Sequence, residues 1–528
     1  MVTLKVGNWS LGFGSKNDEP RKRPLALVIL DGWGYSNNQE GNAIALAHTP
    51  NYDQLCADYP QTVLSASGAR VGLTPDDPGN SEVGHLSLGS GRVVKTPRAM
   101  ISDAITSGEF FQNAELKKAF AHAREKKSKV HLVGLLSDGN IHSSMDSLFS
   151  LLRMSRDEGV GDNTFIHGIL DGKDVDKHTA DIYVEAIQIK LADIGCGKIA
   201  TLCGRHYAMD KSENWARTAR AYTLLTHSEG ERAFDAVTAI RGSFLRGNSD
   251  EFIQPIVIES KPGIPTAKIV DDDVVIFFNH RADRMRQLVK SLCLSETYDF
   301  AAAGKPKVHT VCLTQYHPDF NLPVAFRPGE APNVLAKVFA DNGVLNCRLT
   351  EPEKFDHVTY FFNGGETTEF PGEKRILIEP REASNESNPE MGCFKVTDKL
   401  LRGLEAGEND VFIVNLAAAD ILAQTGDLDK TIEAVQFIDT CLGGIIKKVH
   451  EIDGVALITS DHGNCEQMTN GLSNSHTSNP VPFHLVANNL NGTQLRKDGA
   501  LEDVAPTILG ILGIDKPKEM TGNDLRTI

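Results

Sequence analysis

A serine in a turn of small residues is the first feature of the sequence that could perform chemistry. Ser81 lies in the segment GNSEVGH at positions 79–85, where small neighbours leave room on both sides of its hydroxyl. A serine hydroxyl becomes a good nucleophile only when a base or a metal ion removes its proton. The same pattern is also typical of an ordinary turn. The segment therefore predicts a nucleophile if the chain also supplies a metal site.

Carboxylate and imidazole residues follow three hydrophobic segments that we predict to be strands. They are Asp31 after residues 25–30, Asp420 beyond residues 411–416, Asp461 and His462 after residues 455–460, and His476 in the polar loop that follows. In open α/β sheets the ligand crevice lies outside the carboxyl ends of the strands. A single aspartate after a strand is also a common helix N-cap. Several ligand-type groups at strand ends, together with a nucleophile, favour a metal site.

Strand and helix patterns alternate along the chain, which predicts an α/β fold. Four short apolar segments in the middle of the chain, each followed by polar residues, are strand candidates: 130–135, 165–170, 198–202 and 274–278. Between Thr431 and Val449 the apolar residues recur at helical spacing, which indicates a helix packed on a core.

The placement of the charged residues predicts one domain interrupted by another. The metal-type residues fall near the two ends of the chain and the basic residues fall between them. At 528 residues the chain is too long for one ordinary domain. Proline-containing segments provide boundaries that place one domain at 24–95 and 330–528 and an inserted domain at 96–329. Residues 1–23 read as a loose tail without a secretory apolar core.

The composition is that of a large globular enzyme. Its net charge of -16 argues against a nucleic acid or an anionic membrane as partner, and an anionic substrate then needs a local basic pocket. No apolar run approaches the length that crosses a bilayer. Nine cysteines without paired motifs predict reduced thiols and a cytoplasmic location. We expect a monomer that acts on a small molecule.

Motifs along nearly the whole chain carry a family resemblance. They are VILDGW (28–33), GNA (41–43), GNSEVGH (79–85), LSDGNIHS (136–143), LDGKD (170–174), GRHYAMD (204–210), NHRADR (279–284), EKF with HVT (353–359), FNGG (362–365) and SDHGN (460–464). In this order they make the chain resemble the cofactor-independent phosphoglycerate mutases of the alkaline-phosphatase-like superfamily, from about Pro24 to the end. The resemblance implies a discontinuous phosphatase-like metal domain and an inserted α/β transferase domain.

The resemblance also implies the reaction. The family is expected to interconvert 2-phosphoglycerate and 3-phosphoglycerate, a step of glycolysis and gluconeogenesis. Ser81 would carry the phosphoryl group as phosphoserine, so that no 2,3-bisphosphoglycerate is needed. Asp174 resembles the general acid/base, and Lys354 resembles a cation beside the transferring phosphoryl group. Taken singly, Asp174 could equally be a turn residue and Lys354 a surface lysine.

By the same resemblance two divalent metal ions are bound. Their ligands would be Asp31, Ser81, Asp461 and His462 for one ion, and Asp420 and His476, with Gln424, for the other. Mixed carboxylate and imidazole ligands suit manganese, zinc, iron or cobalt better than calcium. We expect manganese, with magnesium, zinc and cobalt as alternatives.

The substrate-binding residues that the resemblance implies are mostly cationic. They are His142, Lys173, Asp174, Arg205, Lys211, Arg281, Arg284 and Lys354. Guanidinium groups match phosphate oxygens in a bidentate manner, which suits Arg281 and Arg284. An exposed pair of charges at a helix start is the alternative reading of these two arginines.

Three positions depart from the family pattern. Lys173 and Lys211 stand where the family has arginine, and lysine lacks the planar fork of donors. Gln424 stands where the family has a metal-binding histidine four residues after Asp420, and an amide is a poorer ligand than imidazole. Two alternatives to the mutase therefore remain open. One is a catalytically impaired paralogue with a binding or regulatory role, and the other is a metal-dependent phosphatase.

Overall fold

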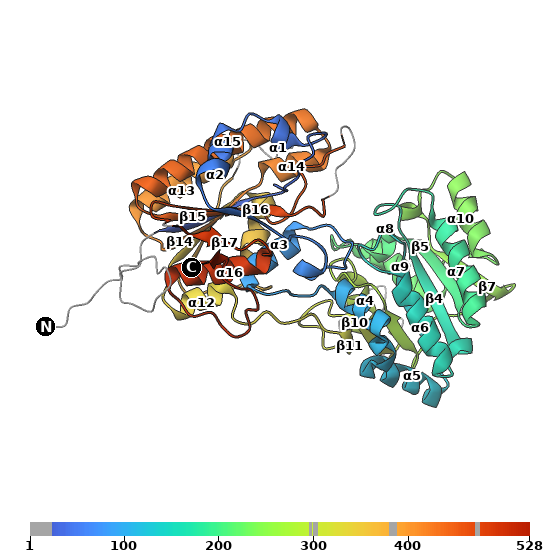
Figure 1. Ribbon diagram of the computed structural model, residues 1–528. Coiled ribbons are helices and arrows are strands. Elements are labelled where there is room, and N and C mark those ends of the chain that lie inside the picture. The colour runs from blue at the N-terminus through green and yellow to red at the C-terminus, as the bar shows by residue number, and fades with distance from the viewer. Residues whose placement is uncertain are drawn as a thin grey trace. The chain divides into compact units, whose positions relative to one another are not determined.

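The computed structural model describes residues 24–294, 298, 305–379, 388–469, 476–490 and 492–527. The predicted tail over residues 1–23 lies outside these ranges. The chain forms two compact units, in which Met1–Thr96 and Gly329–Ile528 make up the outer unit and Pro97–Pro328 the inserted unit. In Figure 1 the outer unit carries the blue and the orange-to-red ribbons, and the inserted unit is mostly green. The predicted α/β fold with one interrupted unit is confirmed.

The outer unit is built on a seven-stranded sheet in the order β13-β12-β14-β1-β15-β16-β2. Its strands are β1 (Leu25–Leu30), β2 (Gln61–Leu64), β12 (Asn346–Thr350), β13 (Glu373–Leu377), β14 (Val411–Leu416), β15 (Val455–Thr459) and β16 (Val481–Ala487). The central strand β1 pairs in parallel with β14 and β15, whereas β16 pairs antiparallel with both of its neighbours, β15 and β2. The three segments predicted to be strands before the aspartates are therefore β1, β14 and β15.

Helices cover both faces of this sheet, because β1 directs alternate side chains into two cores. Leu25, Leu27 and Ile29 pack in one core with residues of α3, α12 and α16, while the residues between them pack with α13, α14 and α15 (Figure 1). The helices of this unit are α1 (Ala43–Leu46), α2 (Pro50–Asp58), α3 (Ser81–Ser90), α12 (Leu335–Asp341), α13 (Cys393–Ala406), α14 (Ala418–Thr425), α15 (Leu428–Glu451) and α16 (Val504–Leu512). The helical stripe predicted between Thr431 and Val449 lies in α15.

The inserted unit has its own sheet, in the order β11-β10-β9-β3-β4-β5-β7-β6, with β8 paired to β7. Its strands are β3 (Val130–Leu136), β4 (Thr164–Leu170), β5 (Lys198–Gly204), β6 (Glu231–Ala233), β7 (Ile256–Lys261), β8 (Ile264–Pro265), β9 (Val274–Phe277), β10 (His309–Thr314) and β11 (Val324–Phe326). The four predicted strands of the middle region are the parallel neighbours β9, β3, β4 and β5.

Two further cores flank the sheet of the inserted unit. Leu132 and Leu136 of β3 pack into one core, and Val133 and Leu135 pack into the other. The helices are α4 (Pro97–Ser107), α5 (Ala114–Lys126), α6 (Met145–Asp157), α7 (Ala180–Ile194), α8 (Arg205–Ala208), α9 (Trp215–His227), α10 (Ala236–Leu245) and α11 (Arg286–Cys293). In the outer unit, a short antiparallel pair, β17 (Gln494–Leu495) and β18 (Arg526–Thr527), completes the strands. In neither unit does a described helix combine the length and the apolarity needed to span a bilayer.

Helix α3 places Ser81 at its first turn. Asn80 is the N-cap residue, and its side chain accepts a hydrogen bond from the Val83 backbone N–H at 3.0 Å. One turn along, Gly84 lets the helix lie directly against the loop that carries Asp461. A Cβ atom on Gly84 would lie 2.9 Å from Asp461 Cβ and would overlap the Asp461 carbonyl oxygen. The missing side chain therefore sets the distance between the serine helix and the aspartate loop.

We expect Gly84→Ala to destabilise the protein by about 1–3 kcal/mol, because the added methyl group forces α3 away from Asp461. Gly444→Ala in α15 is the matched control, since its nearest neighbour would be Leu401 Cδ1 at 3.8 Å. That control should stabilise the helix by about 0.5–1 kcal/mol. Chemical unfolding of the three proteins measures both effects. Shifts of the same sign in the two variants would contradict the close packing at Gly84.

Candidate active site and metal centre

Four neighbouring strands of the outer unit bring the predicted site residues to one edge of the sheet. Asp31 directly follows β1, Asp420 lies in the first turn of α14 after β14, and Asp461 follows β15. Lys354 ends the short helix Pro352–Lys354 that follows β12. Because β12, β14, β1 and β15 are adjacent and parallel, their carboxyl ends lie side by side.

Three fully buried carboxylates dominate this edge. Asp31, Asp420 and Asp461 are each 0 % exposed, and a buried charge is costly unless it is paired. Lys354 Nζ supplies one counter-charge, because it donates to Asp31 Oδ1 at 2.8 Å and to Asp420 Oδ2 at 2.7 Å. Burial and the Asp461 carboxylate raise the pKa of Asp31, but Lys354 and His462 outweigh them and hold it below its ordinary value. Asp31 is therefore ionised at neutral pH.

The Ser81 hydroxyl lies inside this charged cluster. Its Oγ is 2.9 Å from His462 Nε2, accepts a hydrogen bond from Lys354 Nζ at 2.8 Å, and lies 3.5 Å from Asp31 Oδ1. The start of α3 adds the positive end of a helix dipole, which favours an anion at this position. A cation, an imidazole and a helix start thus surround one hydroxyl, and this combination lowers the cost of an alkoxide or of a phosphate on Ser81.

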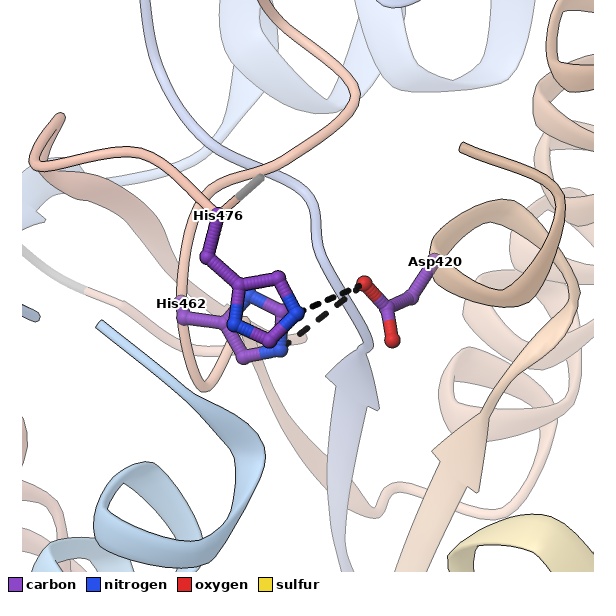
Figure 2. Close-up of side chains that lie close together, drawn as sticks. All are labelled: Asp420, His462 and His476. Carbon is purple, nitrogen blue, oxygen red and sulfur yellow. Dashed lines mark ion pairs between the residues drawn. The ribbon is translucent and has the colours of Figure 1, made fainter. Parts of the chain in front are cut away.

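Asp420, His462 and His476 direct ligand atoms toward one point (Figure 2). The Nε2 atoms of His462 and His476 lie 3.9 Å and 3.8 Å from Asp420 Oδ1, and the two rings stack with centroids 4.0 Å apart. His476 Nδ1 lies 3.0 Å from the Gly79 carbonyl oxygen, which leaves Nε2 for a ligand. Burial lowers the pKa of His462, but Asp461 and Asp420 raise it to about 10. A divalent ion bound here would therefore displace a proton.

A second group of ligand atoms includes His85, which the sequence analysis did not assign. Asp31, His85 and Asp461 have ligand atoms within 4.8 Å of one another. His85 Nδ1 lies 2.9 Å from the Ser81 carbonyl oxygen and 3.2 Å from Asp461 Oδ2. The signal in the sequence was its position four residues after Ser81, which places both on one face of a helix. The buried Asp461 Oδ2 thus lies against two imidazole rings, with His85 Nδ1 at 3.2 Å and His462 Nε2 at 3.5 Å.

His462 stands between the two groups. Its Nε2 lies 3.4 Å from Asp31 Oδ1 and 3.5 Å from Asp461 Oδ2. These distances are similar to the 3.9 Å that separates it from Asp420 Oδ1. The resemblance assigned His462 to the ion of Asp31, Ser81 and Asp461, and its position allows it to serve either group. The donor set of carboxylates and imidazoles fits a transition-metal ion.

Gln424 donates to the carboxylate of Asp420. Its Nε2 lies 2.7 Å from Asp420 Oδ2, the oxygen that Lys354 also contacts, and Asn464 Nδ2 lies 2.8 Å from Asp420 Oδ1. An amide oxygen so close to a carboxylate would be repelled, so the amide nitrogen must face Asp420. In this arrangement Gln424 orients the carboxylate through an N–H group.

The predicted substrate residues of the inserted unit gather at the carboxyl ends of its own parallel strands. Arg205, directly after β5, donates through Nη1 to Asp171 Oδ1 at 2.5 Å and to Asp174 Oδ2 at 2.6 Å. Asp171 follows β4, and its Oδ1 also accepts the backbone N–H groups of Lys173 and Asp174 at 3.1 Å and 3.0 Å. Asp171 was not assigned a role from the sequence, although it lies inside the LDGKD motif. It fixes both Arg205 and the turn that carries Asp174.

His142 and the two later arginines complete this group. His142 Nε2 lies 3.8 Å from Asp174 Oδ2, and its Nδ1 lies 3.7 Å from Asp283 Oδ1. Burial and the charge of Arg205 lower the pKa of His142 to about 4, so its ring is neutral at pH 7. Arg281 Nε lies 3.3 Å from Asp283 Oδ1, and Arg284 Nη1 donates to the Met209 carbonyl oxygen at 3.3 Å.

The two lysines that replace family arginines belong to this unit as well. Lys173 and Lys211 are both exposed residues. Lys173 lies two residues after Asp171, whose carboxylate accepts its backbone N–H. Burial raises the pKa of Asp283, but nearby positive charges, Arg281 first and Lys211 among them, hold it below its ordinary value. Both positions are therefore next to the group formed by Asp171, Asp174, Arg205 and Asp283.

Comparisons with known proteins identify the family of the chain. A family model described as the N-terminus of BPG-independent PGAM matches residues 101–318. The 2,3-bisphosphoglycerate-independent phosphoglycerate mutase of Desulforudis audaxviator is 44% identical over 509 residues, which cover 95% of this chain and 99% of that relative. The protein of the same name from Moorella thermoacetica is 45% identical over 511 residues, covering 95% of this chain and 98% of the relative.

A solved structure adds a match at the level of the fold. The crystal structure of Leishmania mexicana phosphoglycerate mutase at low cobalt concentration superposes with a TM-score of 0.73 at 27% identity, and covers 97% of this chain and 98% of its own. The high identity over nearly the whole length of the curated relatives decides the assignment. The chain belongs to the 2,3-bisphosphoglycerate-independent phosphoglycerate mutase family.

Proposed function

We propose that the chain interconverts 2-phosphoglycerate and 3-phosphoglycerate, with Ser81 as the carrier of the phosphoryl group. The observation that supports this most directly is the position of the Ser81 hydroxyl, 2.8 Å from Lys354 Nζ and 2.9 Å from His462 Nε2. Family membership at 44% identity favours the mutase over an impaired paralogue or a phosphatase. The nine cysteines are free thiols, which supports action in the cytoplasm. We further propose that the protein acts as a monomer.

The residues present fit divalent metal ions, and manganese is the ion that we expect. Asp420 and His476 would hold one ion, and Asp31, Ser81 and Asp461 the other, with His462 between them. Bound divalent ions neutralise phosphoryl oxygens and favour the deprotonated form of a coordinated hydroxyl. Gln424 would orient Asp420 for this purpose.

In this reaction Ser81 would act as the nucleophile and Asp174 as the proton donor and acceptor. The Ser81 oxygen, after the hydroxyl has lost its proton to solvent, would attack phosphorus, and the bond from phosphorus to the glycerate oxygen would break. The leaving oxygen takes a proton from Asp174, which later accepts a proton from the other glycerate hydroxyl. That hydroxyl then takes the phosphoryl group back from Ser81. Lys354 and the start of α3 stabilise the charge on the phosphate throughout.

The inserted unit would bind the glycerate part of the substrate. Arg205 and the neutral ring of His142 can donate hydrogen bonds to the carboxylate and the hydroxyl groups. Arg281 and Arg284 would bind phosphate oxygens, and Lys173 and Lys211 would add positive charge without the planar fork of arginine. Asp171 supports this set because it holds Arg205 in place.

Ser81→Ala should abolish mutase turnover, because no other group then carries the phosphoryl group. An enolase-coupled assay without 2,3-bisphosphoglycerate measures the loss, and circular dichroism checks the fold. Ser87→Ala, at a buried serine of the same helix, is the matched control and should retain activity. Turnover in Ser81→Ala above contamination would refute the nucleophile, and a strict need for 2,3-bisphosphoglycerate in the unmodified protein would refute the proposed reaction.

Asp174→Asn should reduce kcat by about a hundred- to ten-thousand-fold, because the amide cannot shuttle the proton. Manganese affinity should stay the same, since Asp174 belongs to the inserted unit and the ligands to the outer unit. Asp176→Asn, two residues further along the same loop, should behave as the unmodified protein. Calorimetric titration with manganese and the coupled assay give the two readouts. A nearly normal rate in Asp174→Asn would show that the proton takes another route.

Gln424→Met should weaken manganese binding about ten- to a hundred-fold, because Asp420 loses the N–H group that orients it. Gln424→Glu should weaken it as well, since a carboxylate replaces a donor that lies 2.7 Å from Asp420 Oδ2. If Gln424 bound the ion through its oxygen, the anionic glutamate would instead tighten binding. Calorimetric titration of both variants separates these outcomes, and Gln436→Met in α15 is the control for the loss of an amide elsewhere.

A further inference from the structure

A cavity of about 180 Å³ lies between α13 and the edge of the sheet in the outer unit. Its floor is apolar, because it is formed by the side chains of Cys347 of β12 and Phe412 of β14. These two residues are paired in register, and each is 1 % exposed. Leu349 of β12 extends this floor. The volume equals that of roughly six water molecules in the liquid, so the cavity suits a small ligand.

This cavity is separate from the candidate active site. Cys347 lies near the amino end of β12, whereas Lys354 follows the carboxyl end of the same strand. Thr350 lies three residues after Cys347 on this strand, which is about 10 Å at the usual rise per residue. None of the proposed metal or substrate residues lines the cavity.

Positive charge surrounds the opening of the cavity. Lys374 of β13 and Lys399 and Arg402 of α13 line it, against one acid, Glu408. Arg402 is paired with Asp398 at 3.0 Å, but within the described ranges neither lysine has an ion-pair partner. These cations contrast with the net charge of -16 of the whole chain.

Both lysine charges also act on the floor. Burial raises the pKa of the Cys347 thiol to about 11, and the charges of Lys374 and Lys399 act in the opposite direction. Lys374 is also the in-register neighbour of Cys347 on the adjacent strand β13, so its ammonium group can meet an anion whose body lies on Cys347.

We propose that this cavity binds a small organic anion, with its charged group between Lys374 and Lys399 and its apolar part on Cys347, Leu349 and Phe412. Lysine binds phosphate and carboxylate groups as a compact point charge. The apolar floor excludes inorganic phosphate as the preferred ligand, because a fully hydrated ion gains nothing from such a surface. Phenyl phosphate combines the two required parts and serves as the probe.

The test is a calorimetric titration of the full chain with phenyl phosphate, with phenol and inorganic phosphate as probes of one part each. The double variant Lys374→Met/Lys399→Met removes both charges from exposed positions. We expect its affinity for phenyl phosphate to fall about tenfold, in line with the loss of two exposed charge contacts. Ala406→Phe, at the end of α13, should fill the cavity and remove the binding.

The control is Lys447→Met/Lys518→Met, which removes the same charge from two other exposed lysines of the outer unit. Binding of the probe at the active site is common to all these proteins and cancels in the comparison. Unchanged affinity in Lys374→Met/Lys399→Met or in Ala406→Phe would overturn the proposal. So would an equal loss in the control, or binding of phenol as tight as that of phenyl phosphate. Mutase activity should be normal in all variants, so the proposed reaction is tested separately.

Discussion

The burial of three carboxylates around one lysine is the constraint on which the outer unit depends. Asp31, Asp420 and Asp461 have no access to solvent, so water cannot stabilise their charge, and groups of the protein or ions held by it must do so. Lys354 provides the central cation and contacts Asp31 Oδ1 at 2.8 Å, and amide donors reach the carboxylates as well, as Asn415 of β14 does for Asp31 Oδ2 at 2.6 Å. The Ser81 hydroxyl lies among the same charged groups, 2.8 Å from Lys354 Nζ. A nucleophile and its counter-charges are thus preorganised by the same edge of one sheet.

The polar groups of the two units carry an excess of opposite charge. In the outer unit, carboxylates outnumber the fixed cations, which suits a site that attracts metal ions. In the inserted unit, Asp171, Asp174 and Asp283 each accompany an arginine or a histidine, which keeps the cations ordered while further positive groups stay available for an anionic substrate. Both groups of residues follow adjacent parallel strands, and this shared topology explains how one chain can build two polar sites of different sign.

The placement of the site residues was predictable from the sequence wherever it depended on strands. Apolar segments that end in Asp31 or Asp461 are recognisable, and parallel strands bring such ends together. The orientation of individual side chains was not predictable, because it depends on contacts between segments that are distant in the sequence. His85 meets Asp461 across the packing of α3 on a loop, Asp171 meets Arg205 across two strands, and Gln424 turns its nitrogen toward Asp420 because of the carboxylate there.

The central position of β1 has a consequence for synthesis on the ribosome. Its partners β14 and β15 lie near the other end of the chain, roughly 390 residues later for β14. At about 5–20 residues per second, translation needs on the order of 20 to 80 s to produce that partner. The inserted unit is continuous in sequence and can fold within this interval. During the same time the apolar strand β1 lacks its partners β14 and β15. The nascent chain is therefore exposed to mispairing and to chaperone capture at its first strand until β14, in the last quarter of the sequence, has emerged.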